Sequence, residues 1–189
     1  GVSVVKEGEA VCGDAWAVDN QDDEMTIVVA DGLGHGPGAS EAARAAIAVL
    51  PETDGHLSCS ELLERIHAAI RHTRGAAAAV ARLRPHASTV SFAGVGNVGA
   101  SVVTASTHRQ TVSNAGTLGH QARLFREYTY PWASDAMLVL FTDGLTTHWV
   151  IRDIPRLRRH HPAVIAAVLY RDYSRQRDDV TVVVLKEAA

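Results

Sequence analysis

The sequence predicts an α+β fold, a sandwich of antiparallel β-sheets with helices packed on the outside. Short apolar segments rich in Val, Ile and Thr recur along the chain and end at Gly, Asn or Asp, as buried strands do. These segments come in clusters, whereas an alternating parallel fold would need a helix after nearly every strand. The 189 residues suffice for one core and are too few for two ordinary domains, so we expect a single domain over residues 1–189.

The elements follow one another in a clear order. We predict strands at Val2–Val5, Ala15–Val18, Thr26–Ala30, Val90–Ala93, Ala100–Ala105, Met137–Phe141 and Val180–Leu185. A helix is predicted over Pro37–Leu50, because Pro occupies an early helical position and four alanines form a small-residue face. A second helix begins at the capping box that Ser58 forms with Glu61.

Two further segments are harder to assign. A helical region over Asp153–Asp172 is expected to break at Pro155 and Pro162, because Pro removes a backbone donor and clashes with the preceding turn. The Gly75–Pro85 stretch, GAAAAVARLRP, is biased in composition, and we predict a helical tail or a mobile loop there.

Composition excludes several classes of protein. Lys and Arg total 18 against 21 for Asp and Glu, and this net charge of −3 argues against a nucleic-acid partner bound through its phosphates. No apolar run approaches the ~18 residues of a membrane span, so we expect no membrane association. With only two cysteines, the chain suits a reducing compartment, and we expect a cytoplasmic protein that is a monomer.

Aspartates stand at the ends of four predicted strands. Two strands run directly into Asp-Gly-Leu, at Asp31 and at Asp143, while Asp14 and the pair Asp178-Asp179 each precede a strand. A hairpin turning through residues 21–24 pairs residues whose numbers sum to about 45, so Asp14 is predicted to lie opposite Asp31. If the last strand lies antiparallel to the strand before Asp143, all of these carboxylates meet at one edge.

Such a cluster calls for a cation. Carboxylates that converge with little positive charge nearby raise one another's pKa or recruit a metal. Oxygen donors alone select hard ions such as Mg²⁺ or Mn²⁺. Two ions about 4 Å apart would hold a bridging hydroxide and clamp phosphoryl oxygens for in-line attack. The alternative is that an Asp-Gly after a strand serves only as a turn.

The motifs, taken together and in order, resemble those of PPM-type metal-dependent protein phosphatases, specifically the SpoIIE/RsbX branch of bacterial serine phosphatases. The matching segments are Gly13-Asp14, Val29-Ala-Asp-Gly-Leu-Gly-His-Gly36, Asn114-Ala-Gly116, Phe141-Thr-Asp-Gly-Leu145 and Asp178-Asp-Val-Thr-Val-Val-Val184. The resemblance spans nearly the whole chain. It implies a β-sandwich with helices on both faces and a site for two Mn²⁺ or Mg²⁺ ions at one edge.

The resemblance also implies roles for individual residues. Asp31 would bridge both metals, and Gly32 would offer its backbone carbonyl to one of them. Asp14, Asp143 and Asp178 would complete the site, so that these four aspartates would be the catalytic set. Asp179 stands where many relatives have Asn and is expected to support the site from behind.

Other charged residues near these motifs have a possible functional role and a plainer one. His35 lies close enough to Asp31 to act as a general acid, or else it only aids the turn into the helix. Larger members carry an Arg upstream of the first acidic motif to hold the phosphate. Here Lys6 is the only cation near Asp14 on that side, so the substrate-binding group is unknown. A basic cluster over residues 152–161 suits a solvated helix face, with docking of an acidic partner as the alternative.

The leading hypothesis is a metal-dependent phosphatase acting on phosphoserine or phosphothreonine by attack of a metal-bridging hydroxide. By resemblance, its substrate would be a phosphorylated STAS-type regulator, such as an anti-anti-sigma or stressosome protein. The alternative is a non-catalytic module on the same fold that binds a phosphoprotein or a sigma-factor regulator. The missing upstream Arg favours the module, and the intact carboxylate set favours the enzyme.

Overall fold

The computed structural model describes residues 1–21, 23–52, 57–149, 151 and 156–187, which form ten strands and three α-helices. The strands are β1 (Val2–Val4), β2 (Asp14–Gln21), β3 (Glu24–Gly32), β4 (Ala76–Arg84), β5 (Thr89–Val95), β6 (Gly99–Val103), β7 (His108–Gln110), β8 (Glu127–Pro131), β9 (Met137–Phe141) and β10 (Val180–Lys186). The helices are α1 (Pro37–Ala48), α2 (Cys59–Ala69) and α3 (Pro162–Tyr173), with 3₁₀ turns η1 (Leu50–Glu52) and η3 (Leu157–Arg159).

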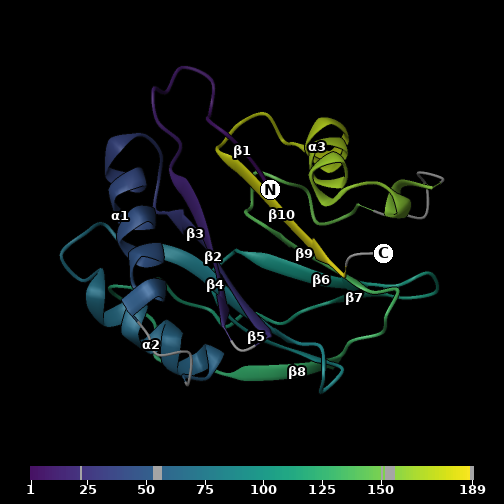
Figure 1. The fold of residues 1–189 in the computed structure, drawn as a ribbon. Helices are drawn as coiled ribbons and strands as arrows, with labels where there is room; N and C mark the ends of the chain where they lie inside the picture. Colours follow the sequence, from purple (N-terminus) through teal and green to yellow (C-terminus); the bar gives the residue numbers. More distant parts are fainter. Residues whose placement is uncertain (22, 53–56, 150, 152–155, 188–189) are drawn as a thin grey trace.

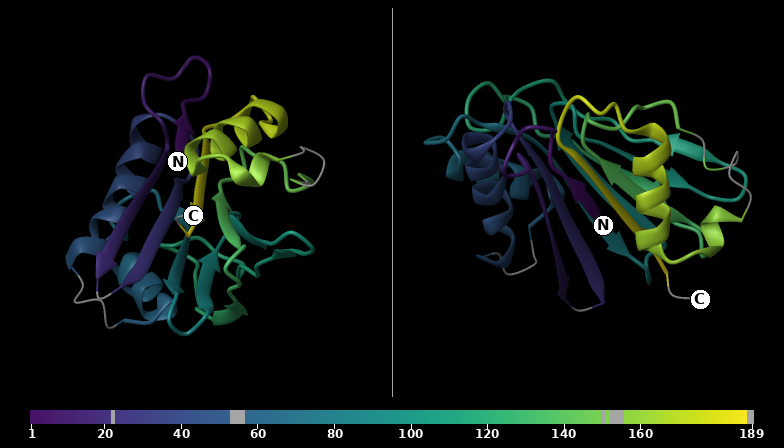
Figure 2. Two further views of the ribbon diagram at one scale, coloured as in Figure 1. Left: turned by 45° about the vertical axis from the view of Figure 1, so that its right-hand side comes forward. Right: turned by 90° about the horizontal axis from the view of Figure 1, so that it is seen from above.

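The strands form two five-stranded antiparallel sheets that face each other. One sheet has the order β1-β10-β9-β6-β7 and the other the order β2-β3-β4-β5-β8. Helices α1 and α2 cover the outer face of the second sheet, and α3 covers the outer face of the first (Figure 1). Seen from above, the four layers follow one another across the molecule (Figure 2). The predicted sandwich with helices on both faces is therefore confirmed.

Three apolar layers hold the sandwich together. The central layer lies between the sheets and includes Ile27, Phe92 and Leu138, all at most 1% exposed. A second layer lies under α1 and α2, and a third joins α3 to its sheet. None of the helices in the described part of the chain is long and apolar enough to span a bilayer.

The small-residue face of α1 lets that helix lie directly on the sheet. Ala39, Ala42, Ala43 and Ala46 are completely buried. A Cβ atom on Gly32, the last residue of β3, would come within 2.0 Å of the Ala39 carbonyl oxygen. This contact brings the end of β3 against the first turn of α1, and so fixes the loop that follows Asp31.

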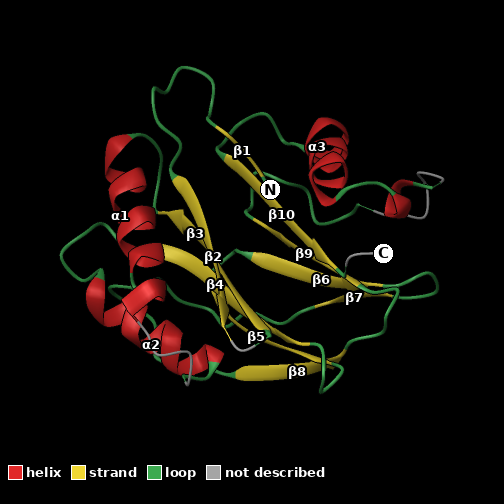
Figure 3. Cartoon of the chain, viewed as in Figure 1, coloured by secondary structure: helices red, strands yellow, loops and turns green. Residues whose placement is uncertain are grey.

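The prediction for Gly75–Pro85 is wrong, because this stretch forms β4, in the middle of its sheet (Figure 3). Alanine favours a helix by local propensity, but tertiary packing overrides that preference here. Ala76 and Ala78 face the helices, whereas Ala79 and Ala81 face the opposite sheet. Small side chains fit both crowded faces of a central strand.

The other element predictions are largely confirmed. The capping box of α2 is present, with the Ser58 hydroxyl and the Glu61 carboxylate each accepting a backbone N–H. A new helix starts at Pro162, as predicted, whereas residues 153–155 lie outside the described part of the chain. The strand predicted over Ala100–Ala105 ends at Val103. The edge strands β7 and β8 carry no strong apolar pattern and were not predicted.

Candidate active site

The predicted pairing of Asp14 with Asp31 is confirmed, because these two residues are direct partners in the β2–β3 ladder. Strands β9 and β10 are also antiparallel, with Phe141 opposite Val182. Asp143 follows β9 and Asp178 precedes β10, so both come to the same end of that pair. The carboxylates from the two sheets thus gather at one edge of the sandwich.

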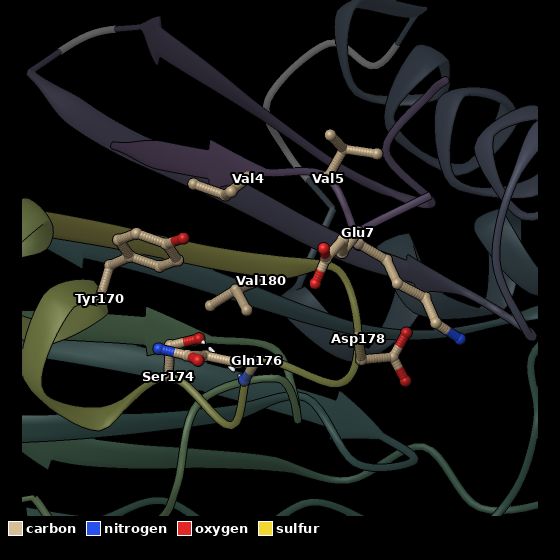
Figure 4. A pocket seen from close by; sticks show the side chains of 9 residues that line it. Val4, Val5, Glu7, Tyr170, Ser174, Gln176, Asp178 and Val180 are labelled. Atoms are coloured by element: carbon tan, nitrogen blue, oxygen red, sulfur yellow. Dashed lines mark hydrogen bonds between the residues drawn. The ribbon is translucent and has the colours of Figure 1, made fainter. Parts of the chain in front are cut away.

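A pocket of about 470 Å³ opens at this edge. It is lined by Asp31, Leu33, Gly34, Ala77, Gly96, Asn97, Gly116, Thr117, Asp143 and Asp178, and is called the acidic pocket below. Thr117 directly follows Asn114-Ala-Gly116, one of the matched segments. Asp178 also lines a second pocket of about 210 Å³. Figure 4 shows its carboxylate at one side of that pocket, with Tyr170 and Val180 along the apolar side.

Asp14 lies behind the acidic pocket and is only 7% exposed. The Thr142 hydroxyl donates to its Oδ2 at 2.8 Å, while its Oδ1 is buried without a hydrogen-bond partner. Burial raises the pKa of Asp14 to about 7, although hydrogen bonds from Thr142 and Thr181 act in the opposite direction. Asp14 is therefore held in place with one oxygen still unused.

Asp31 has the most perturbed carboxyl of the site. Burial raises its pKa to about 9, and repulsion from Asp14, Asp143, Asp178 and Asp179 adds to this effect. The other four carboxylates therefore all lie within electrostatic reach of Asp31. Without a cation, this group cannot be fully ionised at neutral pH.

Asp179 is buried behind the site and does not line the acidic pocket. Its Oδ1 accepts the backbone N–H of Lys6 at 3.0 Å, and its Oδ2 has no hydrogen-bond partner. A Cβ atom on Gly13 would lie 2.7 Å from this Oδ2. Asp179 thus links the start of the chain to the residue before Asp14, a contact suited to the supporting role expected for it.

The donor set fits divalent cations. Two buried carboxylate oxygens, Asp14 Oδ1 and Asp179 Oδ2, have no hydrogen-bond partner among the described residues. The metal ligands that the other pocket carboxylates offer are also oxygens. Within the described residues, no three His, Cys, Asp or Glu side chains already form a cage around one point. Asp143 instead accepts a hydrogen bond of 2.6 Å from the Asn97 amide. Asp14 and Asp143 are thus each held beside the pocket by a hydrogen bond from a neutral side chain.

His35 points away from the acidic pocket in this structure. Its Nδ1 lies 2.5 Å from Glu9 Oε1, and its side chain is 48% exposed. It joins the loop after Asp31 to the loop between β1 and β2, an arrangement that agrees with the plainer of its two expected roles. His120 contacts the Thr73 carbonyl at 3.1 Å, and His148 lines a separate pocket.

Sequence reasoning missed the neutral residues that orient the carboxylates. Thr142 precedes Asp143 in the matched motif, but its contact with Asp14 joins residues 128 positions apart. Asn97 lies in the glycine-rich segment Gly94–Gly99, where a turn between strands was the only local signal. Neither contact could be deduced from spacing along the chain.

Comparisons with known proteins agree with this geometry. The model of the family described as "Stage II sporulation protein E (SpoIIE)" matches residues 21–187. The phosphoserine phosphatase RsbX of Bacillus subtilis (strain 168) is 28% identical over 156 residues, which cover 82% of this chain and 74% of that protein.

Two solved structures extend the likeness to the fold. One, described as "The bacterial stressosome: a modular system that has been adapted to control secondary messenger signaling", matches with a TM-score of 0.89 and 27% identity over 97% of this chain and 95% of that chain. RsbX in complex with magnesium matches with a TM-score of 0.80 and 24% identity, over 97% of this chain and 91% of that chain.

Proposed function

Because the chain belongs to the SpoIIE family, we propose that it is a metal-dependent protein phosphatase that hydrolyses phosphoserine or phosphothreonine on a regulatory protein. The observation that carries this proposal is the meeting of carboxylates from both sheets at one open pocket. Structural ion pairs place opposite charges together, whereas here like charges are buried together at a cost in stability. Such a cost is typical of a functional site.

Two Mn²⁺ or Mg²⁺ ions would be held by Asp14, Asp31, Asp143 and Asp178, with the Gly32 carbonyl as a further ligand. The raised pKa values of Asp14 and Asp31 and the unpaired oxygen of Asp14 support this assignment. When bound, the ions supply Lewis acidity that polarises phosphoryl oxygens and lowers the pKa of coordinated water.

The chain's own residues supply orientation and access. Thr142 holds Asp14 by its Oδ2 and leaves Oδ1 without a hydrogen-bond partner among the described residues. Asn97 holds Asp143 from the pocket wall. Gly96 and Gly116 line the pocket without side chains, which leaves room for a phosphoryl group. Asp179 supports the arrangement from behind through the backbone of Lys6.

We further propose a phosphorylated STAS-type regulator as the substrate. Support comes from the relative RsbX, named as a phosphoserine phosphatase, and from the similar structure described with the bacterial stressosome. We propose that the enzyme is a monomer. We also propose that it is cytoplasmic, in keeping with the free thiols of Cys12 and Cys59.

The test is hydrolysis of p-nitrophenyl phosphate and of a phosphoserine protein, with and without Mn²⁺ or Mg²⁺. We expect activity with metal, none in EDTA, and loss of activity in Asp31→Asn and Asp143→Asn. The matched control is Asp172→Asn, because Asp172 is an exposed aspartate on α3. Activity that survived Asp31→Asn would overturn the site assignment. Calorimetry that showed no metal binding at millimolar concentration would favour the non-catalytic module.

A further inference from the structure

Arg74 lies at the rim of the acidic pocket, in the turn that leads into β4. The Leu33 backbone N–H donates to the Gly75 carbonyl at 2.9 Å, and Ala76 and Leu118 exchange backbone hydrogen bonds. This turn is therefore clamped between the loop after Asp31 and the loop that contains Thr117. Leu33 and Thr117 both line the pocket, so the clamps fix the backbone of Arg74 beside its opening.

The glycines after Asp31 make room for the Arg74 side chain. Its Nη1 donates to the Leu33 carbonyl at 3.3 Å. A Cβ atom on Gly38 would lie 2.7 Å from the guanidinium carbon, and one on Gly34 would lie 3.1 Å from Nη1. Gly38 has no unusual backbone angle that would require glycine. The guanidinium group thus lies in a cradle that larger residues at these positions would fill.

The charge of Arg74 has no ion-pair partner in the described part of the chain. Among the described residues no carboxylate lies within 4.0 Å of its guanidinium, whereas Arg158 pairs with Asp135 and Arg84 pairs with Glu24. Its remaining N–H donors are free to bind a ligand, since the side chain is exposed.

Two other basic side chains lie near Arg74. Arg71 and His120 are exposed and have no ion-pair partner in the described part of the chain. His120 Nε2 lies 3.1 Å from the carbonyl oxygen of Thr73, the residue before Arg74. Arg71 and His120 both lie close enough to His67 to lower its pKa, after burial. We call Arg71, Arg74 and His120 the basic rim. It places positive charge directly beside a pocket that is itself acidic.

Resting on the phosphatase function proposed above, we infer that Arg74 binds an acidic side chain that flanks the phosphorylated residue of the protein substrate. Arg74 does not line the acidic pocket, but its guanidinium lies against Leu33 and Gly34, which do. With a phosphoryl group in the pocket, the adjoining peptide of the substrate would cross the basic rim. There the planar guanidinium suits a carboxylate, with which it can form two hydrogen bonds.

The experiment compares phosphoserine peptides that carry Asp, Ala or Lys at the positions flanking the phosphoserine, with p-nitrophenyl phosphate as the small substrate. In Arg74→Ala we expect the KM of the best Asp-flanked peptide to rise about fivefold, as for loss of one exposed charge pair, with kcat unchanged. Hydrolysis of p-nitrophenyl phosphate should be unaffected, which also shows that the variant folds. Arg74→Glu should reverse the preference, so that Lys-flanked peptides become the better substrates.

The matched control is Arg159→Ala. Arg159 is an exposed arginine in the basic cluster over residues 152–161, for which docking of an acidic partner was the alternative to a solvated helix face. We expect it to leave every KM unchanged. A larger effect from Arg159→Ala than from Arg74→Ala would overturn the inference.

The inference would also be wrong if Arg74→Ala raised the KM of p-nitrophenyl phosphate as much as that of the peptides, or if it changed neither. A wild-type protein that hydrolyses no substrate in the presence of metal would instead contradict the proposed function.

Discussion

Replacing Asp31 by Asn should abolish phosphatase activity and yet stabilise the metal-free protein. At pH 7 an aspartate with its ordinary pKa of 3.8 is ionised in the unfolded chain, whereas Asp31, with a folded pKa of about 9, must take up a proton on folding. The 3.2 pH units between 3.8 and 7 correspond to about 4 kcal/mol of lost stability as an upper limit. Asn mimics the protonated carboxyl and avoids this cost.

The expected gain is about 2 kcal/mol, because part of the cost comes from neighbouring carboxylates that also adjust their protonation. For a chain of this size such a gain raises Tm by at least about 4 °C. The size of this gain depends on pH. A carboxyl whose pKa is raised in the folded state contributes most to stability below pH 4. The free energy of unfolding of the wild type should therefore fall as pH rises from about 4 towards 9. The advantage of Asp31→Asn should grow over the same range.

The assay is thermal and urea unfolding in EDTA between pH 4.5 and 8.5, followed by the same series with Mn²⁺ or Mg²⁺. Metal should raise the Tm of the wild type most at the higher pH values and have less effect on Asp31→Asn. Asp135→Asn is the contrasting control, because hydrogen bonds from Ala105 and Arg158 lower the pKa of Asp135, so this variant should lose slight stability. The reasoning is refuted if Asp31→Asn is no more stable than the wild type in EDTA at pH 7, or if its advantage does not shrink towards pH 4.

Three further predictions concern residues around the site. Gly32→Ala should destabilise the protein by about 3 kcal/mol or more in urea unfolding, since its Cβ would meet backbone atoms of Ala39; near-wild-type stability would contradict that packing. Thr142→Val should cost about 1 to 3 kcal/mol by the same measurement, because it removes a buried donor to Asp14, and a neutral effect would count against that contact. Asn97→Ala should change stability by less than about 0.5 kcal/mol, since the residue is exposed, while weakening Mn²⁺ binding in calorimetry; unchanged metal affinity would remove Asn97 from the site.

The predictions that succeeded rest on strand periodicity. The pairing of Asp14 with Asp31 follows from the position of one turn, because each residue in an antiparallel hairpin has a single partner. The β4 segment failed for the opposite reason. Its alanines show no strand pattern in the local sequence. Its place between β3 and β5 depends on pairing with strands elsewhere in the chain.

The orientation of individual side chains also could not be predicted from the sequence. His35 stands four residues after Asp31, and spacing alone allows its ring to face the site. The contact with Glu9, 26 residues away, turns it elsewhere. Asn97 shows the reverse case, since no motif marks it and yet its amide contacts Asp143 from a different loop.

The sequence by itself determined the family, most of the strands and the aspartates at their ends, because motifs and period-2 patterns are local and depend on neighbouring residues. Only the tertiary structure decided how these carboxylates are buried together, and hence how far the pKa of Asp31 rises, since desolvation and repulsion depend on every segment packed around them. It also decided that Arg74 lies in a cradle formed by Gly34 and Gly38. That contact joins the ends of two strands, β3 and β4, that pair only after the chain has folded.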